Sequence, residues 1–189
     1  MPCLPRPPRR LAPALFTAAL LASALPAQAA ALVQPADVQV QHLGERFVVD
    51  VDLRSPAPPA TAFAVLTDFD HLVGVVPNLT ESRVTARQGL TWRVHQRGVA
   101  RWGIFTLNFE SERELTLDPP REIRAHTLSG NVKAMDSVMR LSADGGGTRL
   151  HYHAEVVPGG WFPPGIGPSM VQHETAEQFS ALLAEMARR

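Results

Sequence analysis

The sequence predicts an α+β domain, in which a curved antiparallel sheet of about six or seven strands wraps around a long C-terminal helix, with two short helices after the first strand. Three observations predict it. Residues 47–53 alternate apolar and polar side chains, residues 79–157 form strand-like segments separated by turn residues, and an apolar residue recurs every three or four positions near the C-terminus. Sequential strands joined by short turns form an antiparallel meander.

The first 29 residues are interpreted as a cleavable signal peptide. Three arginines and no acid precede an apolar run over Leu11–Leu25, which is shorter than the roughly 20 residues of a bilayer span. The run is followed by the small-residue pattern Ala27-Gln28-Ala29, which is typical of a cleavage site. An uncleaved membrane anchor is the alternative, and Pro13 and Pro26 disfavour it. We therefore expect cleavage near Ala29 and export to the periplasm or the medium.

The mature chain then has a short lead over residues 30–37 and one domain over residues 38–189. Three of the 18 basic residues leave with the signal peptide, so that 15 remain against 18 acidic residues, and Lys133 is the only lysine. Binding to nucleic acid requires clustered positive charge, so we expect no nucleic-acid partner. Cys3 is the only cysteine and also leaves, so disulfide and thiol chemistry are not expected.

The first strand is expected over Phe47–Leu53, and Val38–His42 extends it beyond a turn at Gly44. The proline-rich stretch at 56–59 ends this strand, because proline cannot donate to the ladder, and suits the first turn of a helix. That short helix is expected to run through Phe63, Leu66 and Phe69.

A second short helix is expected over His71–Val76, capped by Asp70 and closed by Pro77. The later strands are expected, in chain order, at Val84–Arg87, Trp92–Ala100, Ile104–Leu117, Glu122–Ser129, Met135–Ser142 and Arg149–Val157. The glycines at 145–147 predict a tight hairpin turn between the last two strands.

The long final helix is expected to begin at Ser169 as its cap. Its apolar stripe consists of Val171, Thr175, Phe179, Leu182 and Met186. This stripe must be buried, and the sheet is the surface available to it. A twisted sheet of this size curls, and one helix cannot fill its concave side. Because an empty apolar void costs contacts, the sequence predicts a ligand cavity between the sheet and the final helix.

Three stretches carry a resemblance to a known family: Ala62–Leu72 (AFAVLTDFDHL), Val76-Pro77-Asn78-Leu79, and Pro163–Pro168 (PPGIGP) before His173-Glu174 and Glu177-Gln178-Phe179. With the order of elements, they resemble the START-like helix-grip superfamily (SRPBCC), in particular signal-peptide-bearing bacterial members of its polyketide cyclase/dehydrase and coenzyme Q-binding branch. The resemblance covers Val38–Arg188 and implies a helix-grip fold with a ligand cavity. Related domains bind lipids, quinones or polyketides, and some catalyse cyclisation.

Alternation along the strands and the helical stripe together predict the residues that line this cavity. They are Trp92, Val94, Gln96, Phe105, Leu107, Phe109, Arg113, Met135, Met139, Tyr152, Val171, Phe179 and Leu182. Aromatic and methionine side chains suit an adaptable apolar pocket, although each could equally be ordinary core.

Polar residues in the same register indicate more about the ligand than the apolar ones do. Gln96, Ser111, Arg113, Ser137 and Tyr152 are all expected to face inward among apolar neighbours. A cavity for an oxygenated ligand such as a quinone needs a few donors of this kind to orient it. Two alternatives for Arg113 stay open: it pairs with an acid of the first strand, such as the carboxylates at 50 and 52, or a bulge reverses its direction.

The loop at 158–168 holds Trp161, Phe162 and Ile166 among prolines and glycines. Beside a cavity it is expected either to act as a gate, whose aromatic side chains contact a membrane surface transiently, or to be pinned to the core by them.

Two groups of titratable residues invite other chemistry. His151 and His153 share a strand face, which suits a metal site, but alternation places them on the outer side of the sheet. His173-Glu174 with Asp68 and His71 could form acid/base machinery, or could simply cap and pair at a helix start. The histidine pair lacks a recognised ligand spacing, and nothing fixes a nucleophile or an oxyanion hole beside His173-Glu174, so we expect no metal, no cofactor and no catalytic residue.

These observations favour an exported carrier or binding protein for a hydrophobic small molecule. An aromatase/cyclase-type enzyme that uses the same cavity is the alternative, with Arg113, Tyr152 and Gln96 orienting the substrate. A third possibility is an interaction module of the cell envelope, with a filled core and an apolar surface patch.

Overall fold

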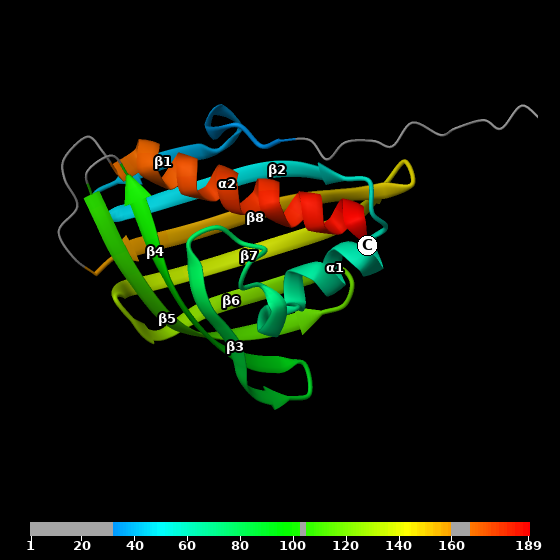
Figure 1. Ribbon diagram of the computed structural model, residues 1–189, viewed down its shortest axis with the longest axis horizontal. Coiled ribbons are helices and arrows are strands. Elements are labelled where there is room, and N and C mark those ends of the chain that lie inside the picture. The colour runs from blue at the N-terminus through cyan, green and yellow to red at the C-terminus, as the bar shows by residue number, and fades with distance from the viewer. Residues whose placement is uncertain (1–31, 103–104, 160–166) are drawn as a thin grey trace, which may run out of the picture.

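Eight strands form one antiparallel sheet in the order β1-β2-β8-β7-β6-β5-β4-β3 (Figure 1). The computed structural model describes residues 32–102, 105–159 and 167–189. The strands are β1 (Gln39–Leu43), β2 (Arg46–Ser55), β3 (Leu79–Gln88), β4 (Thr91–Trp102), β5 (Phe105–Asp118), β6 (Glu122–Gly130), β7 (Val132–Asp144) and β8 (Gly147–Pro158). The predicted meander from β3 to β8 is confirmed, and the return of β8 beside β2 completes the sheet.

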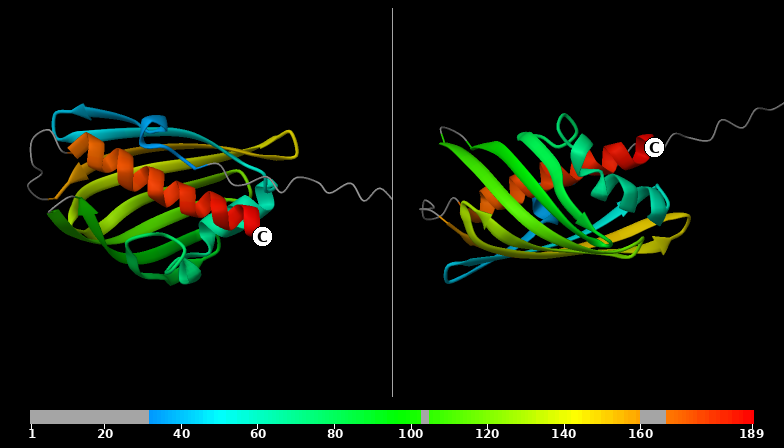
Figure 2. Two further views of the ribbon diagram at one scale, coloured as in Figure 1. Left: turned by 45° about the horizontal axis from the view of Figure 1, so that its top comes forward. Right: turned by 90° about the horizontal axis from the view of Figure 1, so that it is seen from below.

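The helices lie on the concave side of this sheet. They are the short turns η1 (Pro35–Asp37) and η2 (Phe69–His71), the helix α1 (Pro59–Thr67) and the long helix α2 (Gly167–Arg188). Figure 2 shows α2 lying along the hollow of the sheet, with α1 beside its C-terminal end. This is the predicted helix-grip fold. Within the described residues, no helix combines the length and the apolar character needed to cross a bilayer.

The N-terminal part of the fold corrects the expected strand count. Val38–His42 does not extend the first strand: it folds back as β1, with Val40 opposite Val49. The turn holds only two residues, and its Gly44 has a positive φ of 65°. Tight hairpin turns need this conformation, which glycine adopts without strain. The sheet therefore has eight strands rather than six or seven.

The helix boundaries also differ from the prediction. The second short helix is only the turn η2, which begins at Phe69, because Gly74 has a φ of 86° and interrupts helical geometry over 71–76. The Asp70 carboxylate does not cap it, but accepts a hydrogen bond from the Val84 backbone at 2.8 Å. Helix α2 begins at Gly167, so Ser169 lies within its first turn and is not its cap.

One end of the hollow is packed solid. Pro58 and Pro59 start α1, which brings Ala62, Phe63 and Val65 into the core. Helix α1 contacts β7 and β8, on which Leu141 and Leu150 are buried. Proline suits this first turn because its missing N–H would be unpaired there anyway. The cavity lies beside this packed end, under α2, and Leu66 of α1 still borders it.

Candidate functional site

A cavity of about 350 Å³ lies between the concave face of the sheet and α2. Its lining consists of Leu66, Phe69, Leu72, Val76, Leu79, Gln96, Phe109, Glu110, Ser111, Arg113, Leu115, Ile123, Ala125, Asn131, Val132, Met135, Ser137, Met139, Tyr152, Gln178, Phe179 and Leu182. Most of these side chains are apolar. The volume falls within the usual range for small-molecule sites, roughly 300–1,000 Å³.

The cavity follows the direction of β5. It extends from Phe109 to Leu115 along this strand, which at the rise of an antiparallel strand is about 20 Å. Leu66 and Phe69, from α1 and η2, border one end, while Phe109, Asn131 and Gln178 border the other. The space is therefore elongated, as a chain-like or multi-ring ligand requires.

Eight of the predicted lining residues meet in this cavity. They are Gln96, Phe109, Arg113, Met135, Met139, Tyr152, Phe179 and Leu182. The inward-facing Ser111 and Ser137 join them. Their contact with a ligand stays a prediction.

Three predicted residues lie elsewhere in the core. Val94 is fully buried and packs among core side chains, and Val171 is half-buried against them. Trp92 lies beside the β3–β4 hairpin, where its indole N–H donates to the Gly89 carbonyl at 3.2 Å and its ring lies 4.7 Å from the Arg87 guanidinium. Trp92 shares a strand face with Gln96, but it lies beyond the end of the cavity.

Other predicted residues cannot be placed in the cavity. The side chains of Phe105 and Leu107 lie outside the described part of the structure, as do Trp161, Phe162 and Ile166 of the proposed gate.

Several lining residues were missed at the sequence level. Leu72 and Val76 come from the irregular segment after η2, where no periodicity indicates a face, and Leu79 is the first residue of β3. Ile123 and Ala125 alternate along β6, so their inward direction could have been found from the strand pattern alone.

Three hydrogen-bonded polar side chains, those of Ser82, Gln96 and Arg113, form a chain that reaches the wall of the cavity. Gln96 donates through Nε2 to the Ser82 hydroxyl at 3.0 Å, and its Oε1 accepts a short hydrogen bond from an Nη of Arg113. The guanidinium Nε of Arg113 is buried and has no hydrogen-bond partner. Because a guanidinium only donates, Arg113 requires the Gln96 oxygen to face it, and the Gln96 NH₂ group is left to donate to Ser82.

Both open alternatives for Arg113 are resolved. The acids of β2 do not reach it, because Asp50 and Asp52 face outward and pair with His153 and His151 at 2.7 and 3.3 Å. A bulge does lie beside it, between Glu112 and Arg113 in the β5–β6 pairing, yet Arg113 still lines the cavity.

Burial sets the protonation of the two central polar groups. Desolvation lowers the pKa of the Arg113 guanidinium, while its interaction with Tyr152 acts in the opposite direction. Desolvation raises the pKa of the Tyr152 phenol against the effects of Arg113 and of a hydrogen bond with Ser137. An arginine in a protein keeps its proton, so at neutral pH the cavity holds one cation and one neutral phenol donor. The Tyr152 ring packs edge-on against Phe179 of α2, with centroids 5.1 Å apart, and this links the sheet to the helix.

A half-buried carboxylate lies on the first half of α2. Glu174 accepts a hydrogen bond at 3.1 Å from the amide of Asn78, whose φ of 64° is in the left-handed region that asparagine tolerates. The second oxygen of Glu174 is buried without a partner. Desolvation raises the pKa of Glu174, nearby Glu177 adds to this effect, and Asn78 and His173 oppose it.

The substitution Glu174→Gln is expected to stabilise the fold at pH 7. The pKa of Glu174 in the folded protein lies above its unfolded value of about 4.3, so between these two pKa values the native state retains a proton that the unfolded chain releases. The stability of the wild type therefore falls as the pH rises from the unfolded pKa through the folded pKa. A glutamine still accepts from Asn78 but carries no charge. Denaturant unfolding at pH 7 and pH 3 should show a gain that disappears at pH 3. Glu114→Gln, which removes the partner of Arg93 at 3.4 Å, is the control and should give no gain.

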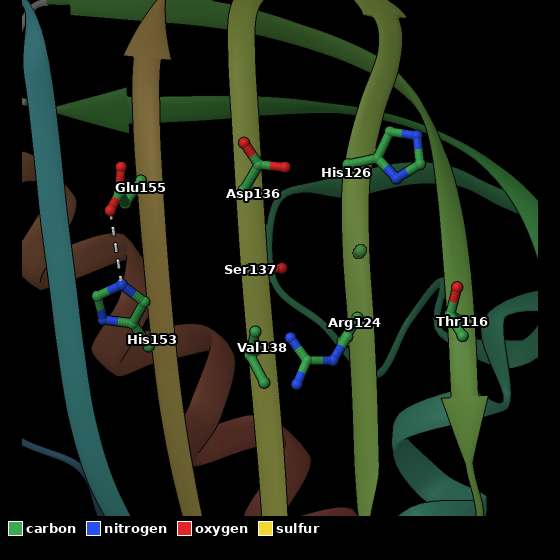
Figure 3. Close-up of a pocket in the computed structure, with 9 residues that line it drawn as sticks. Thr116, Arg124, His126, Asp136, Ser137, Val138, His153 and Glu155 are labelled. Atoms are coloured by element: carbon green, nitrogen blue, oxygen red, sulfur yellow. Dashed lines mark ion pairs between the residues drawn. The ribbon is translucent and has the colours of Figure 1, made fainter.

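The histidines of β8 lie on the outer face of the sheet, as predicted. Figure 3 shows His153 and Glu155 beside Asp136 and His126 along a shallow groove across β5–β8, with His153 and Glu155 4.0 Å apart. Within the described ranges, His, Cys, Asp and Glu side chains do not gather in groups of three or more that could hold a metal ion.

The acid/base grouping considered for His173 is not assembled. His173 pairs with Glu177 at 3.3 Å within α2. Asp68 contacts His71 at 2.6 Å and Arg189 at 2.9 Å, at the opposite end of the same helix. About 16 residues of helix, or some 24 Å, separate the two groups.

Comparison with solved structures supports the fold. The STAR-related lipid transfer protein of Xanthomonas axonopodis superposes with a TM-score of 0.64 at 14% identity, over 81% of this chain and 99% of that one. The Zhui aromatase/cyclase of Streptomyces sp. R1128 gives 0.62 at 20% identity, over 76% and 95%. A protein of Thermus thermophilus gives 0.62 at 20% identity, over 75% and 97%. No curated protein sequence matches the chain.

Family membership follows from the sequence as well as from the shape. The family described as polyketide cyclase/dehydrase and lipid transport matches residues 46–188, which span every described element from β2 to α2. The predicted START-like membership is confirmed by this match together with the helix-grip architecture. This chain therefore belongs to the polyketide cyclase/dehydrase and lipid transport family.

Proposed function

We propose that this protein is an exported, non-catalytic carrier or binding protein for a hydrophobic small molecule, such as a lipid, a quinone or a polyketide-like compound. The observation that carries the proposal is the elongated, mainly apolar cavity between the sheet and α2. Binding is favourable when an apolar ligand replaces the water in a cavity of this kind, because apolar surface is then removed from water. The few polar groups of the cavity orient the ligand.

The comparisons support a ligand-binding role. The family description includes lipid transport, and the Xanthomonas neighbour is named as a lipid transfer protein. The export part of the proposal rests on the N-terminal sequence: three arginines, an apolar run and Ala27-Gln28-Ala29. On this proposal residues 1–29 are removed, and residues 38–189 form the ligand-binding domain.

A cyclase-type enzyme is the second candidate. The observation that favours it is the convergence of Arg113, Gln96 and Tyr152 in the cavity, where they could orient the oxygens of a reactive chain. The Streptomyces neighbour is named as an aromatase/cyclase. The ligand itself separates the two candidates, because a carrier releases its ligand chemically unchanged whereas a cyclase releases a product with a new ring.

One experiment tests both parts of the carrier proposal. The full-length chain is expressed in a Gram-negative bacterium, and the periplasmic fraction is examined by native mass spectrometry. We expect a chain that starts near residue 30 and carries a hydrophobic ligand, which is lost on denaturation. The cavity-filling variant Ala125→Phe should lose the ligand, because Ala125 lines the cavity. The control Thr116→Phe, on the outer face (Figure 3), should keep it.

Circular dichroism checks that Ala125→Phe still folds, since overpacking a core costs about 1–3 kcal/mol. A full-length mass in the cytoplasmic fraction alone would contradict export. A wild-type protein that is empty and takes up no lipid from an extract would contradict the carrier role.

A further inference from the structure

Arg113 is an unbalanced charge inside the cavity. Of the residues that line it, the one other charged residue in the described structure is Glu110. The Glu110 carboxylate is already engaged with Arg97 at 2.9 Å and His95 at 3.1 Å. Along β4, His95 and Arg97 alternate with Gln96, so their side chains point to the outer face of the sheet whereas Gln96 points inward. The interior of the cavity therefore contains a guanidinium and, among the described side chains, no carboxylate that balances it.

An unbalanced buried cation is costly. Proteins normally bury a guanidinium only when it is paired, because removing the charge from water is unfavourable. Here the neutral oxygen of Gln96 is its hydrogen-bond acceptor, and the Nε group has none. A guanidinium presents its donors in a planar fork that suits the two oxygens of a carboxylate. Arg113 thus lines the cavity with a positive charge that no described carboxylate balances, and its bond to Gln96 leaves that charge in place.

Further donors line the same part of the cavity. The Tyr152 phenol interacts with Arg113 and with the Ser137 hydroxyl, and the Ser111 hydroxyl lies two residues from Arg113 on β5. Residues two apart on a strand share a face, so Ser111 and Arg113 point into the cavity together. Apolar side chains surround this group, among them Met135, Met139, Phe179 and Leu182.

We infer that the ligand of this cavity is an amphiphile with a carboxylate group, in which the carboxylate contacts Arg113 and the apolar part occupies the space between β7 and α2. The inference rests on the proposed binding function and specifies its ligand class. A neutral ligand leaves the guanidinium unbalanced, and a cationic ligand adds repulsion. A carboxylate that contacts the guanidinium removes the charge imbalance.

The test compares three probes of equal chain length on the mature, delipidated protein by isothermal titration calorimetry: dodecanoate, methyl dodecanoate and dodecylamine. We expect dodecanoate to bind at least about 10-fold more tightly than the ester, since charge-assisted hydrogen bonds are the stronger kind, and the amine to bind most weakly. The preference should fade as the pH falls below the pKa of the probe's carboxyl group, because the protonated acid then resembles the ester.

The variants locate the effect. Arg113→Met should weaken dodecanoate binding by about 10- to 100-fold and leave ester binding nearly unchanged. The control Arg93→Met also removes one positive charge, but from an exposed pair with Glu114 outside the cavity lining, and should change neither affinity. Equal affinities of the wild type for dodecanoate and its ester would overturn the carboxylate inference while the carrier proposal stands. Failure of every probe to bind would overturn both.

Discussion

Leu150→Ala is expected to lower the free energy of unfolding by about 2–5 kcal/mol, measured by denaturant titration. Leu150 is completely buried, and its neighbours in the sheet are Leu53 on β2 and Leu141 on β7, which are each 6% exposed. The substitution removes apolar atoms from the solid end of the hollow, beneath α1, and the surrounding strands cannot close the gap. The loss therefore includes both the transfer free energy and the cost of a new void.

The matched control is Leu43→Ala, because Leu43 is 59% exposed on the edge strand β1. Its cost should stay within about 0.5 kcal/mol, as for most surface substitutions. Similar costs for the two variants would show that the end of the hollow beneath α1 is not the solid core described above.

Gly98→Ala is expected to destabilise the protein by about 1–3 kcal/mol and to weaken dodecanoate binding. A Cβ atom at Gly98 would overlap both the ring of Phe109 and the carbonyl oxygen of Asn78. The carbonyl cannot easily move, because it accepts a hydrogen bond from the Val99 N–H at 2.8 Å. Both the Phe109 ring and the backbone at Asn78 must then shift, and since Phe109 lines the end of the cavity, the change affects ligand binding as well as stability.

The control for this position is Gly89→Asn. Gly89 has a φ of 61° and no atom within 4 Å of its would-be Cβ, and asparagine tolerates the left-handed conformation. We expect little change in either unfolding free energy or dodecanoate affinity. Wild-type affinity in Gly98→Ala would show that the position of Phe109 does not matter for the site.

Much of the fold could be predicted because each strand buries one face. The alternation of Phe47, Val49, Val51 and Leu53 indicates the buried side of β2, and all four are buried in the structure. The same rule on β5 predicts that Arg113 points inward with Leu115, which it does. Helix boundaries were harder to predict than strand faces, because a single glycine such as Gly74 can end a helix that the apolar pattern would continue.

By itself, the amino-acid sequence determined the order of the elements, the face that each strand buries and the amphipathic final helix, since these depend on spacing along the chain. Only the tertiary structure decided that α1 fills one end of the hollow, that Gln96 rather than Asp50 or Asp52 meets Arg113, and that Trp92 lies beyond the cavity. The physical reason is that volume and pairing depend on how distant segments meet: residues on one face share a direction, but sheet curvature and the position of α1 decide which of them border empty space.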